Sequence, residues 1–511
     1  MEEQLSPQEP LVDELAFPRN ELRQRTVRGA IVNALFMGGA EATVLAQGLI
    51  VTILLGPRDI GLYGIVTTTA MTVVALRRVG IDEAFVQQRE SNQEEEFQRA
   101  FTLELMIGGA FSLILAISAP IVAVVYGDWR LLPLMLGVSY LPTAFALQAP
   151  TWVFFRRMDF LRVRVLQTMV PVISFCVTVP LAAAGVGVWS LIIGPFVGSV
   201  AGVVAALAAS PYRLRLRFDR SAQARYLRFS WPVFVSSAAL LIVQQGQILA
   251  FKLDGGLAAA GYITLAFTLT RYADRADQIV TTTIYPAICL VRDRVSTLQE
   301  IFVKSNRVGL MWALPFCIGL VLFAPDLIRF VIGQAKWHPA VLLIQGLAGA
   351  AAIQQLGYNW FSFYRARGDS SRQAVESAVM FVTFLGLAIP ALFIWGSGGY
   401  VAGRIASALI VLVVRRHYVV RLLPRARLIA LGARGAAPVA VAAIADLGLR
   451  ALLWQGPRTA AQAAVEVVVF VGLTALVTWA AERRLITELV QQVRASRRGE
   501  PGLLSPSGAR P

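Results

Sequence analysis

Apolar stretches of about 18 or more residues recur along almost the whole chain, from Gly29 to Ala481. A bilayer core of about 30 Å requires roughly 20 apolar residues per helix, and inside it every backbone polar group needs a partner within the protein. The sequence therefore predicts an all-α, polytopic membrane protein. The composition agrees, since 56% of the residues are hydrophobic and 15% are charged, against roughly 45–50% and about 25% in soluble proteins.

Breaks at Gly, Pro and charged clusters divide these stretches into about fourteen predicted spans. The first six cover residues 29–55, 61–78, 100–126, 131–155, 166–184 and 187–209. The next six cover residues 229–252, 257–285, 306–332, 339–364, 374–395 and 399–420. The last two cover residues 436–454 and 459–481.

The 47 Lys and Arg residues orient these spans, because cytoplasmic connections of membrane proteins carry an excess of basic residues. Outside the spans, most basic residues fall in the N-terminal segment, the tail and every second connection. The opposite connections hold only Arg58, Arg130, Lys252, Arg329, Lys336, Arg450 and Arg458. We therefore expect both termini to be cytoplasmic. Basic residues spread between apolar stretches do not indicate a nucleic-acid partner, despite a net charge of +16.

The predicted organisation follows from these spans. It comprises a cytoplasmic N-terminal segment 1–28, an N-lobe 29–209, a basic cytoplasmic linker 210–228, a C-lobe 229–420, spans thirteen and fourteen at 436–481, and a cytoplasmic tail 482–511. The acidic start of the chain is unlike a signal peptide. We expect the linker arginines to lie on anionic headgroups, which contribute about 1 kcal/mol per basic residue.

The two predicted lobes resemble one another in sequence. Gly61, in the turn between spans one and two, and Gly261, in the turn between spans seven and eight, are about 200 positions apart. The motif 152–159 at the end of span four similarly aligns with 360–369 at the end of span ten. Both halves run from cytoplasm to cytoplasm, so the repeats are parallel. This predicts two pseudo-symmetric six-helix lobes with a cleft between them.

Polar residues inside spans one and seven are candidates for lining that cleft. At 100° per residue, Asn33, Glu41 and Gln47 lie within roughly 120° of one another, and Gln244 and Gln247 share an arc of span seven. Polar and charged side chains in a membrane usually face a cavity or a partner. Since the repeat makes these spans equivalent, we expect both to face one cleft.

Span eight carries the densest charge. Arg271, Asp274, Arg275 and Gln278 share one helix face, with Asp277 beside them. The arginines and aspartates could neutralise one another as a structural network. Alternatively, a guanidinium remains available for phosphate, which it binds bidentately. Arg404 in span twelve has no partner in the local sequence and joins Arg271 and Arg275 as a candidate substrate-binding residue.

Carboxylates inside spans are candidates for ion coupling, since a membrane carboxyl can exchange a proton or a sodium ion. Glu41 and Asp274 are the main candidates, and Glu104, Asp446 and Glu466 are further ones; for each, a structural hydrogen bond is the alternative.

Three cysteines without a Cys-x-x-Cys pair and two histidines predict no metal, cofactor or catalytic residue.

Three segments resemble bacterial polysaccharide flippases of the multidrug/oligosaccharidyl-lipid/polysaccharide exporter superfamily. They are the Leu-Gly-Pro-x-Asp-x-Gly-x-Tyr-Gly turn at 55–64, the exit 79–84 and the edge 154–160. The resemblance covers about residues 20–420 and implies two lobes around a cationic cavity, alternating access and an undecaprenyl-pyrophosphate-linked oligosaccharide as cargo. It also implies export of O-antigen, capsule or exopolysaccharide across the bacterial inner membrane. The exit, Gly-Ile-Asp-Glu, is more acidic than the usual Gly-Leu-Gly.

The expected partners are the lipid-linked oligosaccharide, anionic membrane lipids, and polysaccharide polymerase and chain-length proteins. A peptidoglycan lipid-precursor flippase and a cation-coupled drug exporter of the same superfamily remain alternatives, as does a scaffold that recruits assembly enzymes. A polymerase or ligase would need a large outer loop with catalytic residues, and no connection exceeds about twenty residues. We therefore expect a transporter and not an enzyme.

Overall fold

The structure is a computed structural model that describes residues 19–77, 92–157, 159–218, 246–291, 293–367, 371–424, 427–453 and 459–498, together with 81, 85 and 369. Side chains before residue 36 and after residue 491 lie outside this description. Within the described ranges the chain is helical and contains no β-strand. The predicted all-α membrane fold is confirmed.

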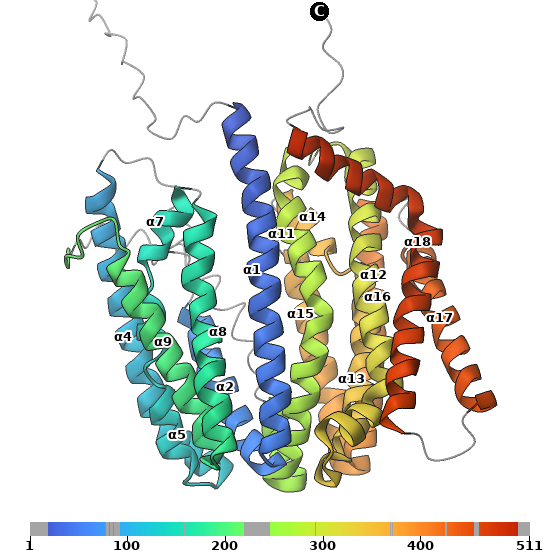
Figure 1. The fold of residues 1–511 in the computed structure, drawn as a ribbon, viewed down its shortest axis with the longest axis horizontal. Helices are drawn as coiled ribbons and strands as arrows, with labels where there is room; N and C mark the ends of the chain where they lie inside the picture. Colours follow the sequence, from blue (N-terminus) through green and yellow to red (C-terminus); the bar gives the residue numbers. More distant parts are fainter. Residues whose placement is uncertain are drawn as a thin grey trace, which may run out of the picture.

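The first half of the chain forms one group of helices, the N-lobe (Figure 1). Its elements are α1 (Arg19–Leu54), α2 (Pro57–Arg77), α4 (Gln93–Tyr126), α5 (Leu131–Val138), α6 (Leu141–Leu147), α7 (Pro150–Arg156), α8 (Phe160–Ala183), η1 (Gly187–Trp189) and α9 (Ser190–Ala208). Asn92 caps the start of α4, and Gly127 ends it in a left-handed conformation, φ 60°. In the next turn Arg130 donates to Asp128 (2.7 Å), which lowers the pKa of that carboxyl below its usual value.

The second half forms the C-lobe and two further helices packed against it (Figure 1). Its elements are the helical segment 246–270, η2 (Arg271–Ala273), α11 (Asp274–Leu290), α12 (Val295–Asp326), η3 (Leu327–Ile332), η4 (Ala335–Trp337), α13 (Ala340–Gln354), α14 (Trp360–Ala366), α15 (Ser371–Thr383), η5 (Phe384–Ala388), α16 (Ile389–Leu422), α17 (Leu428–Leu453) and α18 (Ala460–Arg498). Helices α17 and α18 contact each other and α12.

The fourth and tenth predicted spans are both broken helices. In the N-lobe, Pro142 and Pro150 start α6 and α7, where the missing proline N–H costs no hydrogen bond. In the C-lobe, α13 and α14 are separated at Gly357, whose φ is 70°. Arg415 of α16 donates to the carbonyls of Gln354 and Leu356 in this break. It thereby satisfies acceptors that the helix end leaves unpaired.

The segment Arg372–Leu422 is a helical hairpin that reverses at Gly396 (φ 65°). Thr383 and Ser407 hydroxyls lie 2.6 Å apart, so the helices before and after Gly396 pack side by side. This geometry agrees with the two spans predicted at 374–395 and 399–420. By length and composition, the described residues contain eleven helices able to cross a membrane. The chain is a multi-pass membrane protein, and the total of fourteen spans stays a prediction.

Among the described residues, the hydrophobic core that the lobes share lies at one face. Val51 of the N-lobe and Ile263 of the C-lobe belong to the same buried cluster there. At the other face, which we call the terminal face because α1 begins and α18 ends there (Figure 1), each lobe has a core of its own. Phe97 belongs to the N-lobe core and Phe302 to the C-lobe core. In the described part of the chain, the lobes therefore share a hydrophobic core at one face and have separate cores at the terminal face.

Two glycines allow the lobes to meet closely. A Cβ added to Gly61 of α2 would overlap the carbonyl oxygen of Leu257, and one added to Gly261 would overlap the carbonyl of Pro57. Gly61 and Gly261 are the positions that the sequence repeat aligns. The equivalent helices of the two lobes thus cross with their backbones in contact, as small residues permit in membrane proteins.

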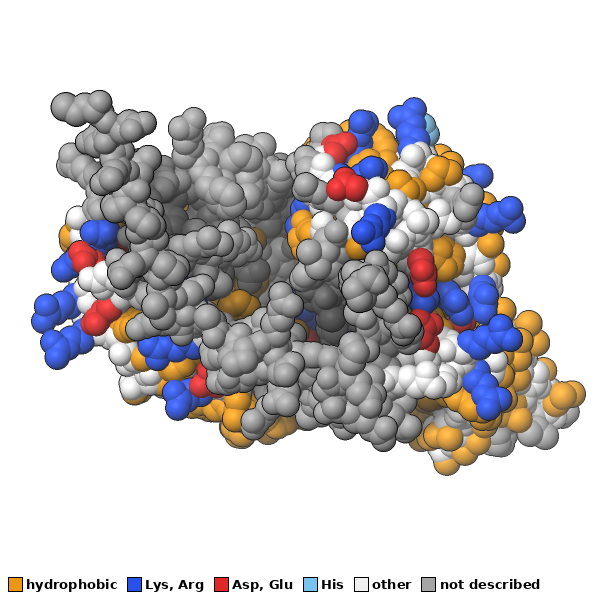
Figure 2. Space-filling view, turned by 90° about the horizontal axis from the view of Figure 1, so that it is seen from above, with side chains coloured by type: hydrophobic (Ala, Val, Ile, Leu, Met, Phe, Trp, Pro, Cys, Tyr) orange, Lys and Arg blue, Asp and Glu red, His pale blue; other side chains and the backbone are white. Residues whose placement is uncertain are grey.

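Lys and Arg side chains gather on the terminal face over both lobes (Figure 2). On the N-lobe they include Arg99, Arg213 and Arg217, and on the C-lobe Arg365, Arg483 and Arg484. Because basic residues accumulate on the cytoplasmic side of membrane proteins, this distribution supports a cytoplasmic terminal face.

Candidate functional site

An ion pair joins the lobes where α1 passes α11. Arg275 Nη2 of α11 lies 3.0 Å from Glu41 Oε1 of α1, and the two side chains are 36% and 33% exposed. Arg275 also donates to the Gln278 side chain (3.3 Å). A pair this exposed contributes only about 0–1 kcal/mol.

Arg271 lies one helical turn before Arg275, at the start of η2, and its side chain is exposed. Its guanidinium interacts electrostatically with Tyr63 of α2 and with Tyr272. Arg271 is thus exposed and Arg275 half-buried, and the two cations are four residues apart beside the contact between the lobes. Guanidinium groups so arranged can bind phosphate oxygens bidentately.

The aspartates of the same helix face the interior of the C-lobe instead. Asp274 accepts a hydrogen bond from Gln355 Nε2 (2.5 Å) in the break after α13. Asp277 is only 3% exposed and lies directly against Gly309 of α12. Helix α11 thus presents basic groups to the lobe interface and acidic groups to the C-lobe interior.

Arg404 is placed apart from these arginines, in α16 after the hairpin. It lies four residues beyond the buried Tyr400, with which it interacts electrostatically. Its Nε and Nη1 atoms are buried and have no hydrogen-bond partner among the described residues. No contact between Arg404 and Arg271 or Arg275 is described, so its part in a common site stays a prediction.

The candidate glutamines make contacts within their own lobes. Gln47 donates to Thr178 of α8 (3.3 Å) in the N-lobe. Gln247 is buried in the C-lobe and accepts a hydrogen bond from Tyr400 (2.9 Å). The Asn33 side chain and the whole of Gln244 lie outside the described residues.

Two buried ion pairs were not predicted from the sequence, although one of them includes Glu104, a candidate for ion coupling. Arg77 of α2 pairs with Glu104 of α4, and Arg415 of α16 pairs with Glu376 of α15 (2.8 Å). Each links helices of a single lobe. The two residues of each pair are far apart in sequence, so helical spacing could not predict that they pair. For Arg415, the sequence offers Gly357 as a sign of a helix break whose carbonyl groups need a donor.

The acidic residues of the last two spans form a separate cluster. Arg450 of α17 lies 3.2 Å from Asp446, 2.9 Å from Glu466 of α18 and 4.0 Å from Asp326 of α12. The cluster links α12, α17 and α18 and includes no residue of α1 or α11. It gives Asp446 and Glu466 a structural environment, and their role in ion coupling is untested.

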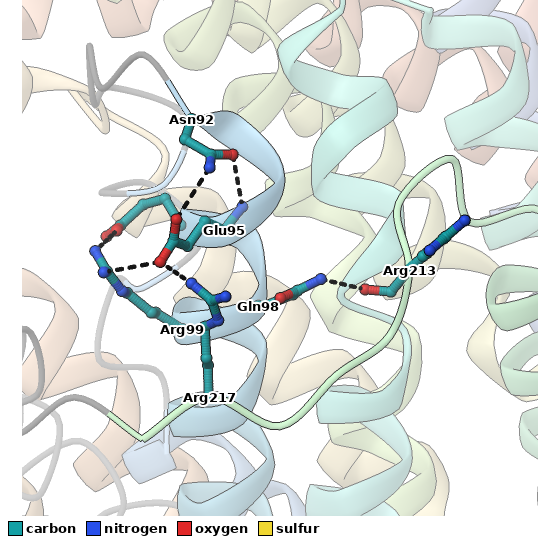
Figure 3. Close-up of polar contacts among 7 residues, drawn as sticks. Asn92, Glu95, Gln98, Arg99, Arg213 and Arg217 are labelled. Atoms are coloured by element: carbon teal, nitrogen blue, oxygen red, sulfur yellow. Dashed lines mark hydrogen bonds and ion pairs between the residues drawn. The ribbon is translucent and has the colours of Figure 1, made fainter.

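The described part of the linker, residues 210–218, is an extended strap along α4 (Figure 3). Gln98 donates to the carbonyl of Arg213 (2.9 Å), and Arg217 pairs with Glu95. Leu216 and Phe218 remain exposed beside these arginines. The strap therefore presents alternating basic and apolar side chains at the terminal face.

The sequence was compared with known proteins. It matches the family described as "Polysaccharide biosynthesis protein" over residues 50–342. It is 24% identical over 310 residues to the succinoglycan biosynthesis transport protein ExoT of Rhizobium meliloti (strain 1021). This match covers 60% of the chain and 59% of that relative, which is less than two thirds of the relative's length.

The fold is similar to solved transporters. The lipid II flippase MurJ in an inward closed conformation aligns with a TM-score of 0.68 at 12% identity, covering 88% of this chain and 99% of that chain. An inward-facing multidrug resistance MATE family transporter of the MOP superfamily aligns at 0.62 and 14% identity, covering 78% and 100%. An outward-facing conformation of a MATE family transporter gives 0.51 at 13% identity, also covering 78% and 100%.

The fold therefore defines a two-lobed, multi-pass membrane protein with the architecture of the MOP superfamily transporters. The chain belongs to the polysaccharide biosynthesis protein family, whose match spans more than half of it.

Proposed function

We propose that the protein flips an undecaprenyl-pyrophosphate-linked oligosaccharide across the bacterial cytoplasmic membrane, with both termini in the cytoplasm, for export of O-antigen, capsule or exopolysaccharide. Family membership supports a role in polysaccharide biosynthesis, and the two-lobed fold supports alternating access. The observation that carries the proposal is the pair of cations, exposed Arg271 and half-buried Arg275, beside the contact between the lobes.

Loading takes place from the cytoplasmic leaflet, since the lobes are joined at the opposite face and separately packed at the terminal face. A pyrophosphate is a stronger ligand for guanidinium than a single carboxylate, because it offers more oxygens and more charge. Its oxygens bind Arg271 and Arg275 and displace Glu41. Glu41 thus competes with the substrate for the Arg275 guanidinium.

The sugars and the pyrophosphate cross in a wet passage between the lobes, while the lipid tail stays in the bilayer. Transfer of such an anion without water or cationic partners would be prohibitively costly. Rocking of the lobes about the Gly61–Gly261 contact then exposes the headgroup on the other side. Anionic lipids and polymerase or chain-length proteins are proposed partners, the former on the basic terminal face.

The proposal is tested with the full chain in proteoliposomes that contain an undecaprenyl-pyrophosphate-linked oligosaccharide. Replacing Arg271, Arg275 and Arg404 together by alanine is expected to slow flipping by about tenfold or more, which corresponds to about 1.4 kcal/mol of lost stabilisation. Arg130→Ala, an exposed arginine at the opposite face, is the matched control and is expected to keep the wild-type rate.

Three results would count against this proposal. Undiminished flipping by the triple variant would remove the arginine site. Transport of organic cations that does not respond to these substitutions would favour a drug exporter, and loss of cell viability on depletion would favour the peptidoglycan-precursor flippase.

A further inference from the structure

An aromatic pair lies on α12 beside the two arginines of the proposed site. Trp312 is 48% exposed, and its ring stacks on that of Phe316, one helical turn further on, with ring centroids 5.7 Å apart and planes at 14°. The neighbouring residues Ala313 and Leu314 are buried, so Trp312 lies on a side of α12 that the C-lobe core leaves uncovered. The pair therefore presents a flat apolar ring face outside that core.

The polar end of Trp312 is bonded to the segment that carries the arginines. Its indole Nε1 donates to the backbone carbonyl of Tyr272 (3.1 Å) in η2. A donor is favourable there, because a change from α to 3₁₀ geometry leaves backbone carbonyls with poor intrahelical partners. With its N–H group bonded and Phe316 stacked against it, the indole ring has a fixed orientation.

Tyr272 connects this ring face to the ion pair between the lobes. It directly follows Arg271 in the chain, and it interacts electrostatically with Glu41, Arg275 and Arg271. The aromatic pair therefore adjoins both guanidinium donors and a carboxylate acceptor. An apolar and aromatic surface with a few polar groups at its edge is typical of binding sites for small polar ligands.

Two parts of a glycolipid could contact this surface, the lipid tail or a sugar. Exposed tryptophans of membrane proteins usually direct their N–H groups to the headgroup region, whereas Trp312 donates to the protein backbone. A lipid tail would gain nothing from the adjoining charges and would separate them from water, which is costly. A sugar suits both parts of the surface. Its partially positive C–H groups stack on the partially negative ring face, and its hydroxyls bond to guanidinium and carboxylate.

We propose that Trp312 and Phe316 bind the sugar ring attached directly to the pyrophosphate, while Arg271 and Arg275 bind the pyrophosphate itself. This subsite rests on the proposed function. The first sugar is bonded to the pyrophosphate through a single oxygen, so its subsite has to adjoin the phosphate site. The connection from Arg271 through Tyr272 to Trp312 provides that proximity. The subsite thus favours a lipid that carries a glycan over the same lipid without sugar.

Binding to the detergent-purified full chain tests the subsite with two lipids. One is an undecaprenyl-pyrophosphate-linked oligosaccharide, and the other is undecaprenyl pyrophosphate without sugar. Trp312→Leu keeps an apolar side chain but removes the ring face. It is expected to raise the Kd for the sugar-bearing lipid about three- to tenfold and to leave the Kd for the sugar-free lipid unchanged. Trp312→Phe, which keeps a ring, is expected to retain most of the affinity.

Two controls are expected to bind both lipids like the wild type. They are Trp129→Leu, an exposed tryptophan at the opposite face, and Glu300→Gln, an exposed carboxylate elsewhere on α12. Thermal unfolding checks the fold of each variant. Phe316→Leu, expected to show the same selective loss, replaces Trp312→Leu if that variant does not fold.

The outcomes separate the subsite from the proposed function. Equal losses for both lipids would place the tail or the pyrophosphate at Trp312, and an unchanged Kd for both would place neither there; each result would overturn the subsite. Binding of both lipids without dependence on Trp312 would leave the proposed function intact. A wild type that binds neither lipid would contradict the proposed function, and the subsite with it.

Discussion

Arg275 is a proposed substrate-binding residue that also forms an ion pair between the two lobes. Its partner Glu41 belongs to the other lobe, and both side chains are partly solvated. Such a pair adds only about 0–1 kcal/mol to the stability of one arrangement of the lobes, so either residue can change partner at small cost. By contrast, Arg77 with Glu104 and Arg415 with Glu376 are buried within single lobes. Removing one partner from a buried pair costs far more, about 3–5 kcal/mol, so these pairs keep each lobe rigid.

Glu41→Gln is expected to lower the Kd for a pyrophosphate-bearing lipid by about two- to fivefold. The substitution removes the carboxylate that competes for Arg275, and an exposed ion pair is worth about 0.2–1 kcal/mol. Binding to the detergent-purified chain measures this, with Glu300→Gln as the control. A Kd that is unchanged or raised would show that Glu41 does not compete with the substrate.

At the scale of elements, the strap 210–218 and helix α4 form a unit at the terminal face. The strap has no helix or sheet of its own, and its backbone groups bond to α4 side chains (Figure 3). The acidic first turn of α4, Glu94 to Glu96, is favourable at a helix N-terminus and also attracts the strap arginines. One short acidic run thus stabilises the start of α4 and binds the connection between the lobes.

Glu95→Gln is expected to loosen this strap. Loss of the ion pair with Arg217 removes about 0.2–1 kcal/mol, and cleavage of an opened segment follows its population. Limited trypsin digestion after Arg213, Arg215 and Arg217 is therefore expected to become about two- to fivefold faster. Equal rates for the variant, the wild type and the Glu300→Gln control would show that the backbone contacts alone hold the strap.

At the scale of the whole molecule, the two lobes contact each other backbone to backbone at Gly61 and Gly261. The shared core surrounds this contact, whereas the terminal ends of the lobes are packed separately. A transporter that changes access must keep some contact as a pivot while others separate. The backbone contact between equivalent helices is suited to that role, since it involves no long side chain that must repack.

Gly61→Ala is expected to destabilise the protein by about 1–3 kcal/mol and to slow flipping, because its Cβ overlaps the Leu257 carbonyl. Gly109→Ala on α4 is the matched control. An added Cβ there meets no atom within 4 Å, and alanine is favoured over glycine in a helix by up to about 1 kcal/mol. Thermal unfolding and the flipping assay measure both variants. A Gly61→Ala protein as stable as the control would mean that the helices separate without cost.

The sequence by itself determined the class of protein. Long apolar stretches have only one stable backbone form in a bilayer, so the all-α membrane fold was predicted correctly, and the motif at 55–64 indicated the family that the comparison confirmed. Apolar stretches and short motifs depend on neighbouring residues in the chain, so they can be read from the sequence without knowing how the helices pack.

Only the tertiary structure decided the partner of each polar group. Gln47 and Gln247, predicted to face a cleft, bond to Thr178 and Tyr400 within their own lobes. Arg275 binds Glu41 from the other half of the chain, and Gln355, absent from the predicted site, holds Asp274. Helical spacing gives the side of a helix on which a residue lies. It does not give the helix that packs against that side, because this depends on how the two lobes dock.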